Sequence, residues 1–465
     1  MGSVIAGSRM TVPAGTSSTD VARRSEISGR VSLRELMRPM KGVWPAVDAT
    51  NGPITADTIT AGSPTTTGLR FIAPNTGNLK FQNGYMLSNA AGVDANTSGS
   101  TIHYNAPTPR IQNYGGRAYN PLDGNVEMGF VTNATQVTIV YYNNGYYDST
   151  AYHDMQIYAE HEGSMKKLTV LPKTGNFTGV GYRTITFKEA RSKEFRVFMQ
   201  SACWIIGVYI NTLAVIQPAP NRFLMLMNGD SWNEPSGDTL QDVAGGAWPT
   251  GVYRSWYLPQ ALSEATGFCV GSFAQGGTGY FNPFTGDNTS ENANHVSNFG
   301  GQPRVNDFAA KFASRYPLIF QLGGWNDGAN YTLAAYRTRV LDGIDRFIAA
   351  KSDIQIALAG IQPAGGVGVA SGVTPYPSQM FDMNDAIMEV PALRPSNVIG
   401  AVDMEPMWPD MSTSGQRGTA VGPDGMHLHI GGATQVAEYL AAGLAKMTIP
   451  RDYYQAMLTA SPNYS

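Results

Sequence analysis

Charged residues, cysteines and long apolar runs are all scarce in this chain. Asp, Glu, Lys and Arg make up only 14% of its 465 residues, against about a quarter in an average soluble domain. The 32 basic and 35 acidic residues give a net charge of −3, which is not the basic balance of a nucleic-acid-binding domain. No segment approaches the roughly 18 consecutive apolar residues of a membrane helix, and the N-terminus lacks the charged region and apolar core of a signal peptide. We therefore expect neither a nucleic-acid partner nor a membrane segment.

Only two cysteines are present, Cys203 and Cys269, and they fall in different predicted domains. Both stand in apolar surroundings, so we interpret them as buried free thiols rather than as a disulfide. The chain is rich instead in hydrophobic residues, at 42%, and in glycine, with 52 residues. At this length the composition predicts two or three domains with substantial cores and many turns.

Residues 1–50 form a polar, locally basic leader. It is too poor in apolar residues to bury a core of its own, and two interpretations stay open: a disordered tail, or an arm that becomes ordered only against a partner. Within it, residues 31–38 predict one or two helical turns that end at Pro39.

Residues 51–216 show the pattern of an antiparallel β-sandwich of jelly-roll type. Apolar and polar residues alternate over 137–142 and 194–199, as half-buried strands require. Turn signals recur at 83–84, 123–124, 144–145 and 174–175. Four tyrosines between 141 and 147 are interpreted as cross-strand packing, with a sugar-binding platform as the alternative.

A stiff linker is predicted at Gln217-Pro-Ala-Pro220, after which the periodicity becomes that of an α/β domain over 222–447. Short apolar runs lie at 223–227, 267–273, 318–322, 354–359 and 398–402, and helical patterns lie at 251–265, 304–315, 332–350 and 434–446. Strands that alternate with helices predict a parallel sheet in a three-layer arrangement. Residues 448–465 are assigned to a C-terminal tail.

The first apolar run of this domain ends in Gly229-Asp230-Ser231. Parallel sheets place reactive groups at the carboxyl ends of their strands, so Ser231 is where a nucleophile is expected. Gly-Asp-Ser alone is also an ordinary turn composition. The chemical interpretation therefore depends on whether the chain supplies partners for the serine.

A serine needs a base, most often a histidine held by a carboxylate. His427 lies in a glycine-rich loop before the last helical pattern, and Asp424 stands three residues upstream, near enough in a tight turn to bond the imidazole. The reaction also needs hydrogen-bond donors for a developing oxyanion. The loop after the third run offers the Asn326 side chain, and the loop after the second offers a backbone N–H at Gly277.

Taken in this order, Gly229-Asp-Ser231, Gly277, Gly324-Trp-Asn326 and Asp424-Gly-Met-His427 resemble the four blocks of the SGNH (GDSL-type) hydrolases. The resemblance covers residues 222–447 and implies a flavodoxin-like three-layer fold. It also implies Ser231 as nucleophile, His427 as general base and Asp424 as its orienting carboxylate. The oxyanion hole would consist of the N–H groups of Ser231 and Gly277 with the Asn326 side chain, and Asp230 would be structural.

Two positions depart from the pattern of this family. The glycine block usually begins with Asn, but Ser272 occupies that position here, which leaves Gly279 as an alternative oxyanion donor. His429 is an additional histidine, interpreted as structural, with a place in the substrate site as the alternative. No cofactor and no metal are expected, because no set of Cys, His and acidic residues accompanies the histidines.

The preceding β-domain resembles the sandwich fused to some bacterial SGNH carbohydrate esterases. This arrangement implies a serine esterase that removes acyl groups, acetyl above all, from a polysaccharide. Leader, β-domain and esterase together also resemble a bacteriophage tail or receptor-binding protein, whose location would be the virion and whose residues 1–50 would contact other virion proteins. The alternatives are a secreted or cytosolic esterase for small esters, and a glycan-binding virion appendage without activity.

Substrate contacts are expected from Trp232, Trp325, Gly279 and Tyr280, which stand in or beside the blocks. Aromatic side chains favour both sugar stacking and burial, so the tryptophans are equally suited to the core. A homo-oligomer is compatible with a tail protein, but no heptad run predicts a coiled-coil trimer.

Overall fold

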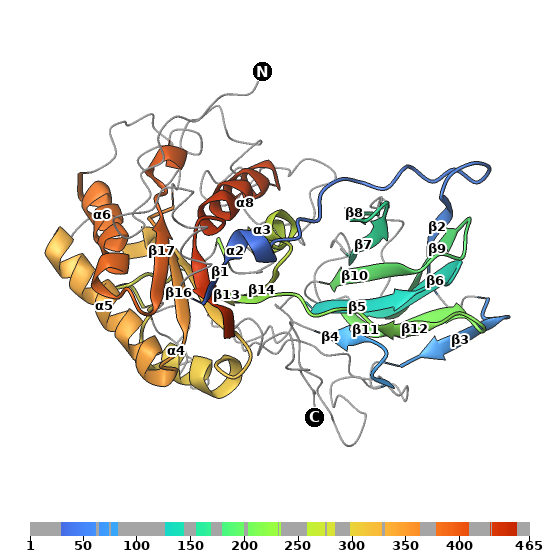
Figure 1. The fold of residues 1–465 in the computed structure, drawn as a ribbon, viewed down its shortest axis with the longest axis horizontal. Coiled ribbons are helices and arrows are strands. Elements are labelled where there is room, and N and C mark those ends of the chain that lie inside the picture. Colours follow the sequence, from blue (N-terminus) through green and yellow to red (C-terminus); the bar gives the residue numbers. More distant parts are fainter. Residues whose placement is uncertain are drawn as a thin grey trace.

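The computed structural model describes residues 29–61, 65–73, 76–81, 126–143, 155–168, 179–199, 203–230, 232–233, 258–274, 277–283, 298–327, 331–362, 378–408, 428 and 430–452. Two domains lie side by side (Figure 1), an all-β domain and an α/β domain, and β13 carries the chain from the first into the second.

The β-domain consists of two antiparallel sheets. One sheet has the order β12 (Ile216–Pro218), β5 (Val126–Thr132), β10 (Lys193–Met199), β7 (Met155–His161) and β8 (Ser164–Lys167), and β4 (Lys80–Phe81) also pairs with β5. The other has the order β2 (Ile54–Ala61), β9 (Gly179–Phe187), β6 (Gln136–Asn143), β11 (Cys203–Asn211) and β3 (Leu69–Ile72). Inward-facing side chains of both sheets form one apolar core, which confirms the predicted β-sandwich.

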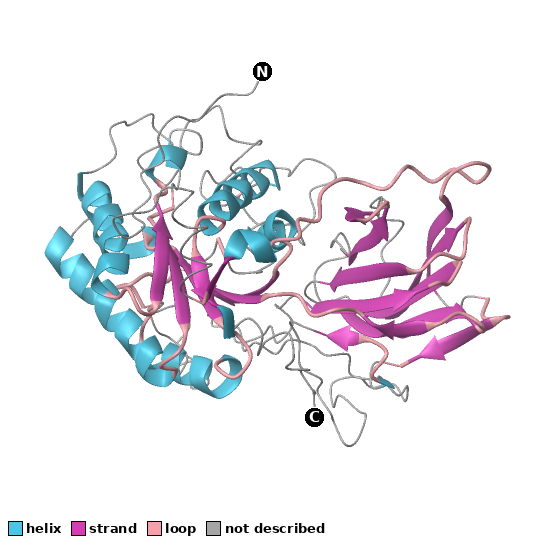
Figure 2. Ribbon diagram, in the orientation of Figure 1, coloured by secondary structure: helices cyan, strands magenta, loops and turns pink. Residues whose placement is uncertain are grey.

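The α/β domain contains a parallel sheet with the strand order β14 (Cys269–Ala274), β13 (Leu224–Gly229), β15 (Leu318–Leu322), β16 (Gln355–Ala359) and β17 (Val398–Val402). Numbered along the chain, this is the 2-1-3-4-5 order of flavodoxin-like folds. Every residue of these five strands is buried, as expected where helices cover both faces. The predicted fold class is confirmed (Figure 2).

Two separate apolar cores lie on the two faces of this sheet. Helices α3 (Leu258–Thr266) and α8 (Ile430–Leu444) pack on one face. The other face is covered by α4 (Gln302–Asp307) with its π-helical continuation Phe308–Phe312, and by α5 (Leu333–Ala350) and α6 (Ser378–Leu393). Helix α6 has no counterpart among the predicted helices.

The predicted linker at 217–220 is partly wrong, because Ile216–Pro218 forms β12 at the edge of the sandwich and pairs with β5. An edge strand tolerates proline, since one side of its backbone has no strand to bond. The domains therefore meet almost without a spacer. Arg222, just before β13, reaches back and its Nη1 donates to Glu127 Oε2 on β5 at 2.7 Å.

The N-terminal segment 29–50 is not a leader separate from the domains. Strand β1 (Arg30–Ser32) pairs antiparallel with β18 (Thr448–Pro450), and the helical turn α2 (Leu33–Leu36) follows, as predicted for this stretch. Leu33 is fully buried in the α/β domain. The chain then continues to the sandwich (Figure 1), where the Trp44 and His161 rings stack with their centroids 4.3 Å apart. This part of the predicted arm is thus ordered against its own chain.

Among the described helices, none is long and apolar enough to cross a membrane. Cys269 is a buried free thiol, as predicted.

Candidate active site

Three of the four sequence blocks meet at one edge of the parallel sheet. Asp230 follows β13, Gly277 follows β14 and Asn326 follows β15, and these three strands are neighbours in the sheet. Ser231, Asp424, His427 and His429 lie outside the described residues, so the predicted triad remains a prediction.

Asp230 holds the turn after β13. Its Oδ1 accepts the Trp232 N–H at 3.1 Å and its Oδ2 accepts a bond from Gln362 Nε2. The carboxylate is fully buried, which fits the structural role that the resemblance implies. Gly229 is required here, because a Cβ would lie 2.3 Å from the Leu322 carbonyl oxygen.

Ser272, which departs from the pattern that the four blocks resemble, bonds the segment that follows β13. Its hydroxyl donates to the Asn233 carbonyl at 2.5 Å, and Asn233 Nδ2 donates to the Leu322 carbonyl at 2.9 Å. Asn233 is therefore bonded to β14 and to β15, the two strands that neighbour β13. A serine at position 272 suffices for this contact.

The loop after β14 presents the predicted oxyanion donors. Gly277 has φ +75°, a conformation that favours glycine, and within the described part of the chain its N–H has no acceptor. The Gly279 N–H donates instead to the Asn282 carbonyl at 3.0 Å, which removes it as an alternative donor. Asn326 Nδ2 donates one hydrogen to the Thr278 carbonyl at 3.0 Å, so its second hydrogen remains for another acceptor.

Asp327 is a residue of this site that the sequence did not reveal. Its Oδ2 accepts the Tyr280 N–H and the Tyr336 hydroxyl, both at 2.8 Å, and its Oδ1 accepts the N–H groups of Phe281 and Asn282 at 2.8 and 2.7 Å. Burial raises the pKa of this carboxyl, although the four donors act in the opposite direction. The position directly after Asn326 was the only available signal.

Three residues predicted to contact the substrate, Trp232, Gly279 and Tyr280, are involved in packing within the domain. Tyr280 is only 1% exposed and packs between the rings of Phe299 and Tyr336, so it belongs to the core. Trp232 is also buried in a core cluster. Gly279 is where a Cβ would meet Asp327 Oδ1 at 2.1 Å, which gives this glycine a packing reason.

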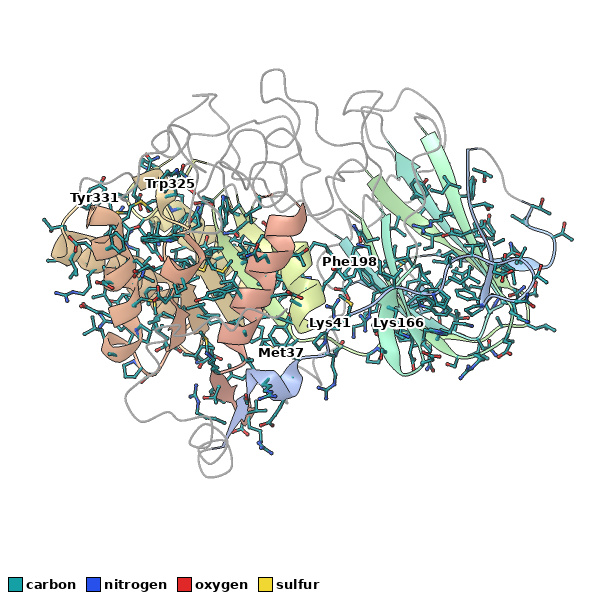
Figure 3. The ribbon with its side chains drawn as sticks, turned by 90° about the horizontal axis from the view of Figure 1, so that it is seen from above. Met37, Lys41, Lys166, Phe198, Trp325 and Tyr331 are labelled. Atoms are coloured by element: carbon teal, nitrogen blue, oxygen red, sulfur yellow. The ribbon has the colours of Figure 1, made fainter. Side chains whose placement is uncertain are left out.

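Trp325 is half-buried, and Figure 3 shows it at the end of the α/β domain far from the sandwich. It therefore stays a candidate for substrate contact. Across the described ranges, no three His, Cys, Asp or Glu side chains gather in a way that could hold a metal ion.

No protein-family model matches the chain, and no curated protein matches it. A putative GDSL-like lipase from Bacteroides ovatus is 12% identical with a TM-score of 0.48, over 82% of this chain and 98% of the lipase. A salicylyl-acyltransferase from a tetracycline biosynthetic pathway is 10% identical with a TM-score of 0.47, over 84% and 98%. A family two carbohydrate esterase from Cellvibrio japonicus is 13% identical with a TM-score of 0.44, over 83% and 99%.

Because the identities are 10–13% and the TM-scores lie below 0.5, the function of this chain has to come from its own residues.

Proposed function

We propose that the chain is a serine esterase of the SGNH type. The observation that carries the proposal is the meeting of three sequence blocks on adjacent strands, with the Asn326 amide 3.0 Å from the Thr278 carbonyl oxygen, one residue beyond Gly277. An acyl-transfer site needs a serine and fixed hydrogen-bond donors, and the loop N–H of Gly277 and the Asn326 side-chain amide are candidates for these donors.

In this mechanism Ser231 attacks the ester carbonyl while His427 accepts its proton, and Asp424 keeps the imidazole oriented. The tetrahedral oxyanion takes hydrogen bonds from the N–H groups of Ser231 and Gly277 and from Asn326. Collapse expels the alcohol, which receives the proton from His427. Water then attacks the acyl-enzyme by the same route and releases the acid.

The proposed substrate is an acetyl ester on a carbohydrate. Its support is the order of domains, a β-sandwich directly followed by the hydrolase domain, which resembles that of SGNH carbohydrate esterases.

The test compares wild type and Ser231→Ala on p-nitrophenyl acetate. We expect the variant to lose at least about 10³-fold in kcat, since the nucleophile is essential to the acyl-enzyme. Equal, slow hydrolysis by both proteins would contradict the esterase proposal and would favour a glycan-binding protein without activity.

A second experiment tests the substrate class by comparing acetate release from an O-acetylated polysaccharide with hydrolysis of butyrate and octanoate esters. A preference for the longer acyl chains would contradict an acetyl ester as the substrate.

We further propose that the protein is a virion component, which the order of leader, β-domain and esterase supports. Because residues 30–36 are packed into the α/β domain, a clean test removes residues 2–28 only. Loss of assembly into the particle with retained esterase activity supports attachment through this segment. Unchanged assembly would show that residues 2–28 are not the attachment segment, and absence of the full-length protein from the particle would favour a secreted or cytosolic esterase.

A further inference from the structure

Arg304 joins the end of β13 to the loop after β14 through a single guanidinium group. Its side chain, on α4, is fully buried. Nη1 donates to Asn228 Oδ1 at 3.0 Å and to the Gly229 carbonyl at 3.4 Å, and Nη2 donates to Thr278 Oγ1 at 3.2 Å. One nitrogen thus binds the strand end, and the other binds the loop.

The guanidinium is also confined by aromatic rings. It lies 5.5 Å from the centroid of Phe299 and 6.0 Å from that of Phe273. Contacts of this kind restrict the plane of the group and are favourable for a cation. Arg304 therefore has little freedom to follow either segment if the other moves.

The atoms that Arg304 binds adjoin the proposed reacting groups. Gly229 precedes Ser231 by two residues, and Thr278 follows Gly277 directly. The carbonyl of Thr278 also accepts the bond from Asn326 Nδ2. Arg304 is consequently connected to the nucleophile turn on one side and to both proposed loop donors on the other.

We propose that Arg304 is a positioning residue of the esterase site, whose planar fork sets the separation between the turn that carries Ser231 and the loop that carries Gly277. This inference rests on the proposed function. Oxyanion donors act because they are fixed where negative charge develops, and a displacement of about 1 Å can cost about 10²-fold in rate. A rigid group that spans the two segments supplies that fixation.

Two substitutions test the bridge from its two ends. Thr278→Val removes the hydroxyl acceptor at nearly constant volume, and Arg304→Lys keeps the charge but replaces the fork by a single nitrogen. We expect each to lower kcat on p-nitrophenyl acetate about 10-fold or more, with KM changed less than about 2-fold, because the lost contact acts in the transition state. Thr278→Ser keeps the hydroxyl and is expected to recover most of the kcat lost in T278V.

Arg346→Lys is the matched control. Arg346 Nη1 donates to the Gly300 carbonyl at 3.0 Å, and Gly300 belongs neither to residues 228–233 after β13 nor to the loop 277–283 after β14. Its substitution is expected to leave kcat within about 2-fold of wild type, the range of an interaction not made in the transition state. Melting temperatures of all variants show whether a lower kcat merely follows lower stability.

Hydrogen exchange of the amides of residues 277–282 measures the positioning itself, independently of any activity. Faster exchange in T278V and R304K, but not in T278S or R346K, supports the bridge, even if the wild type proves inactive and only the proposed esterase fails. Unchanged exchange, a kcat loss shared by T278S, or a loss confined to KM would overturn the inference.

Discussion

Asp327 accepts four hydrogen bonds, three of them from the consecutive N–H groups of residues 280–282 and one from Tyr336. It is adjacent to Asn326, so the same short turn provides a proposed oxyanion donor and the acceptor that holds the neighbouring loop. Gly279 lacks a side chain because this carboxylate fills the space. The two loops are therefore attached to one another at several atoms.

Asp327→Asn replaces one acceptor oxygen by an NH₂ group that faces existing donors. We expect a loss of about 1.5–3 kcal/mol in the free energy of unfolding, typical of hydrogen bonds to a charged group, and a kcat on p-nitrophenyl acetate lowered by about 10-fold or more, because the donor loop loses its anchor. Urea unfolding and steady-state kinetics measure the two effects.

The control for this prediction is Asp403→Asn. Asp403 is likewise buried after a strand, where its Oδ1 accepts Asn384 Nδ2 at 2.9 Å and the Glu405 N–H at 3.0 Å. It should lose comparable stability and keep its kcat. If both variants lose the same fraction of kcat, Asp327 has only a general structural role.

At the scale of elements, β1 pairs with β18 of the α/β domain, which lies more than 400 residues away in the sequence. Besides the pairing with β18, the Leu33 N–H donates to the Met447 carbonyl at 2.9 Å and the Arg30 Nη2 donates to the Thr448 carbonyl at 2.7 Å. Leu33 and Ile449 are both fully buried. The two ends of the described chain thus share one small part of the core.

Leu33→Ala should lower the free energy of unfolding by about 2–5 kcal/mol, as for other fully buried leucines. Arg34→Ala, one residue further along and exposed, is the matched control and should change it by less than about 0.5 kcal/mol. Urea unfolding followed by tryptophan fluorescence checks both. A neutral Leu33→Ala would mean that residues 29–36 pack loosely on the domain.

Elements with a strong local pattern could be predicted from the sequence. The runs 318–322 and 398–402 became β15 and β17 with the same limits, because a strand buried on both faces is a continuous apolar run. Helix α6 was missed because its 16 residues include Asn384 and Pro391 within a Met-rich stretch without a clear polar face. Strands β1 and β18 have three residues each and are paired over more than 400 positions, so no local pattern can reveal them.

The same distinction applies to the site. The four blocks could be recognised in the sequence because each follows an apolar run or precedes a predicted helix. The contacts of Arg304 with Thr278 and of Asp327 with residues 280–282 join positions 26 and 45–47 residues apart. Such contacts depend on strand order in the finished sheet, which the sequence pattern did not specify.

At the scale of the whole molecule, the two domains are joined by a partly buried polar junction. Met40 lies between them with Tyr158 and Phe198 of the sandwich, and Figure 3 shows Met37, Lys41 and Phe198 along this seam. The Met40 N–H donates to the Glu264 carbonyl at 2.9 Å, and the Tyr158 hydroxyl donates to Glu264 Oε1. Helix α3 therefore contacts both the N-terminal segment and the sandwich at Glu264.

Stability of this junction should depend on pH through Glu264. Although Lys167 Nζ lies 3.5 Å from Oε1, burial between the domains raises the pKa of Glu264 to about 9. A raised carboxyl pKa means that the folded state binds the proton more tightly, so the stabilisation is complete below the ordinary pKa of 4.5 and is lost as the pH rises towards 9. The free energy of unfolding falls by up to about 1.4 kcal/mol per pH unit. For domains of this size, each kcal/mol corresponds to about 2–4 °C in Tm.

Calorimetry between pH 5 and pH 10 should show a steeper decline of Tm in the wild type than in Glu264→Gln, which keeps the acceptor for Tyr158 without the charge. Parallel curves for the two proteins would show that Glu264 does not titrate in this range.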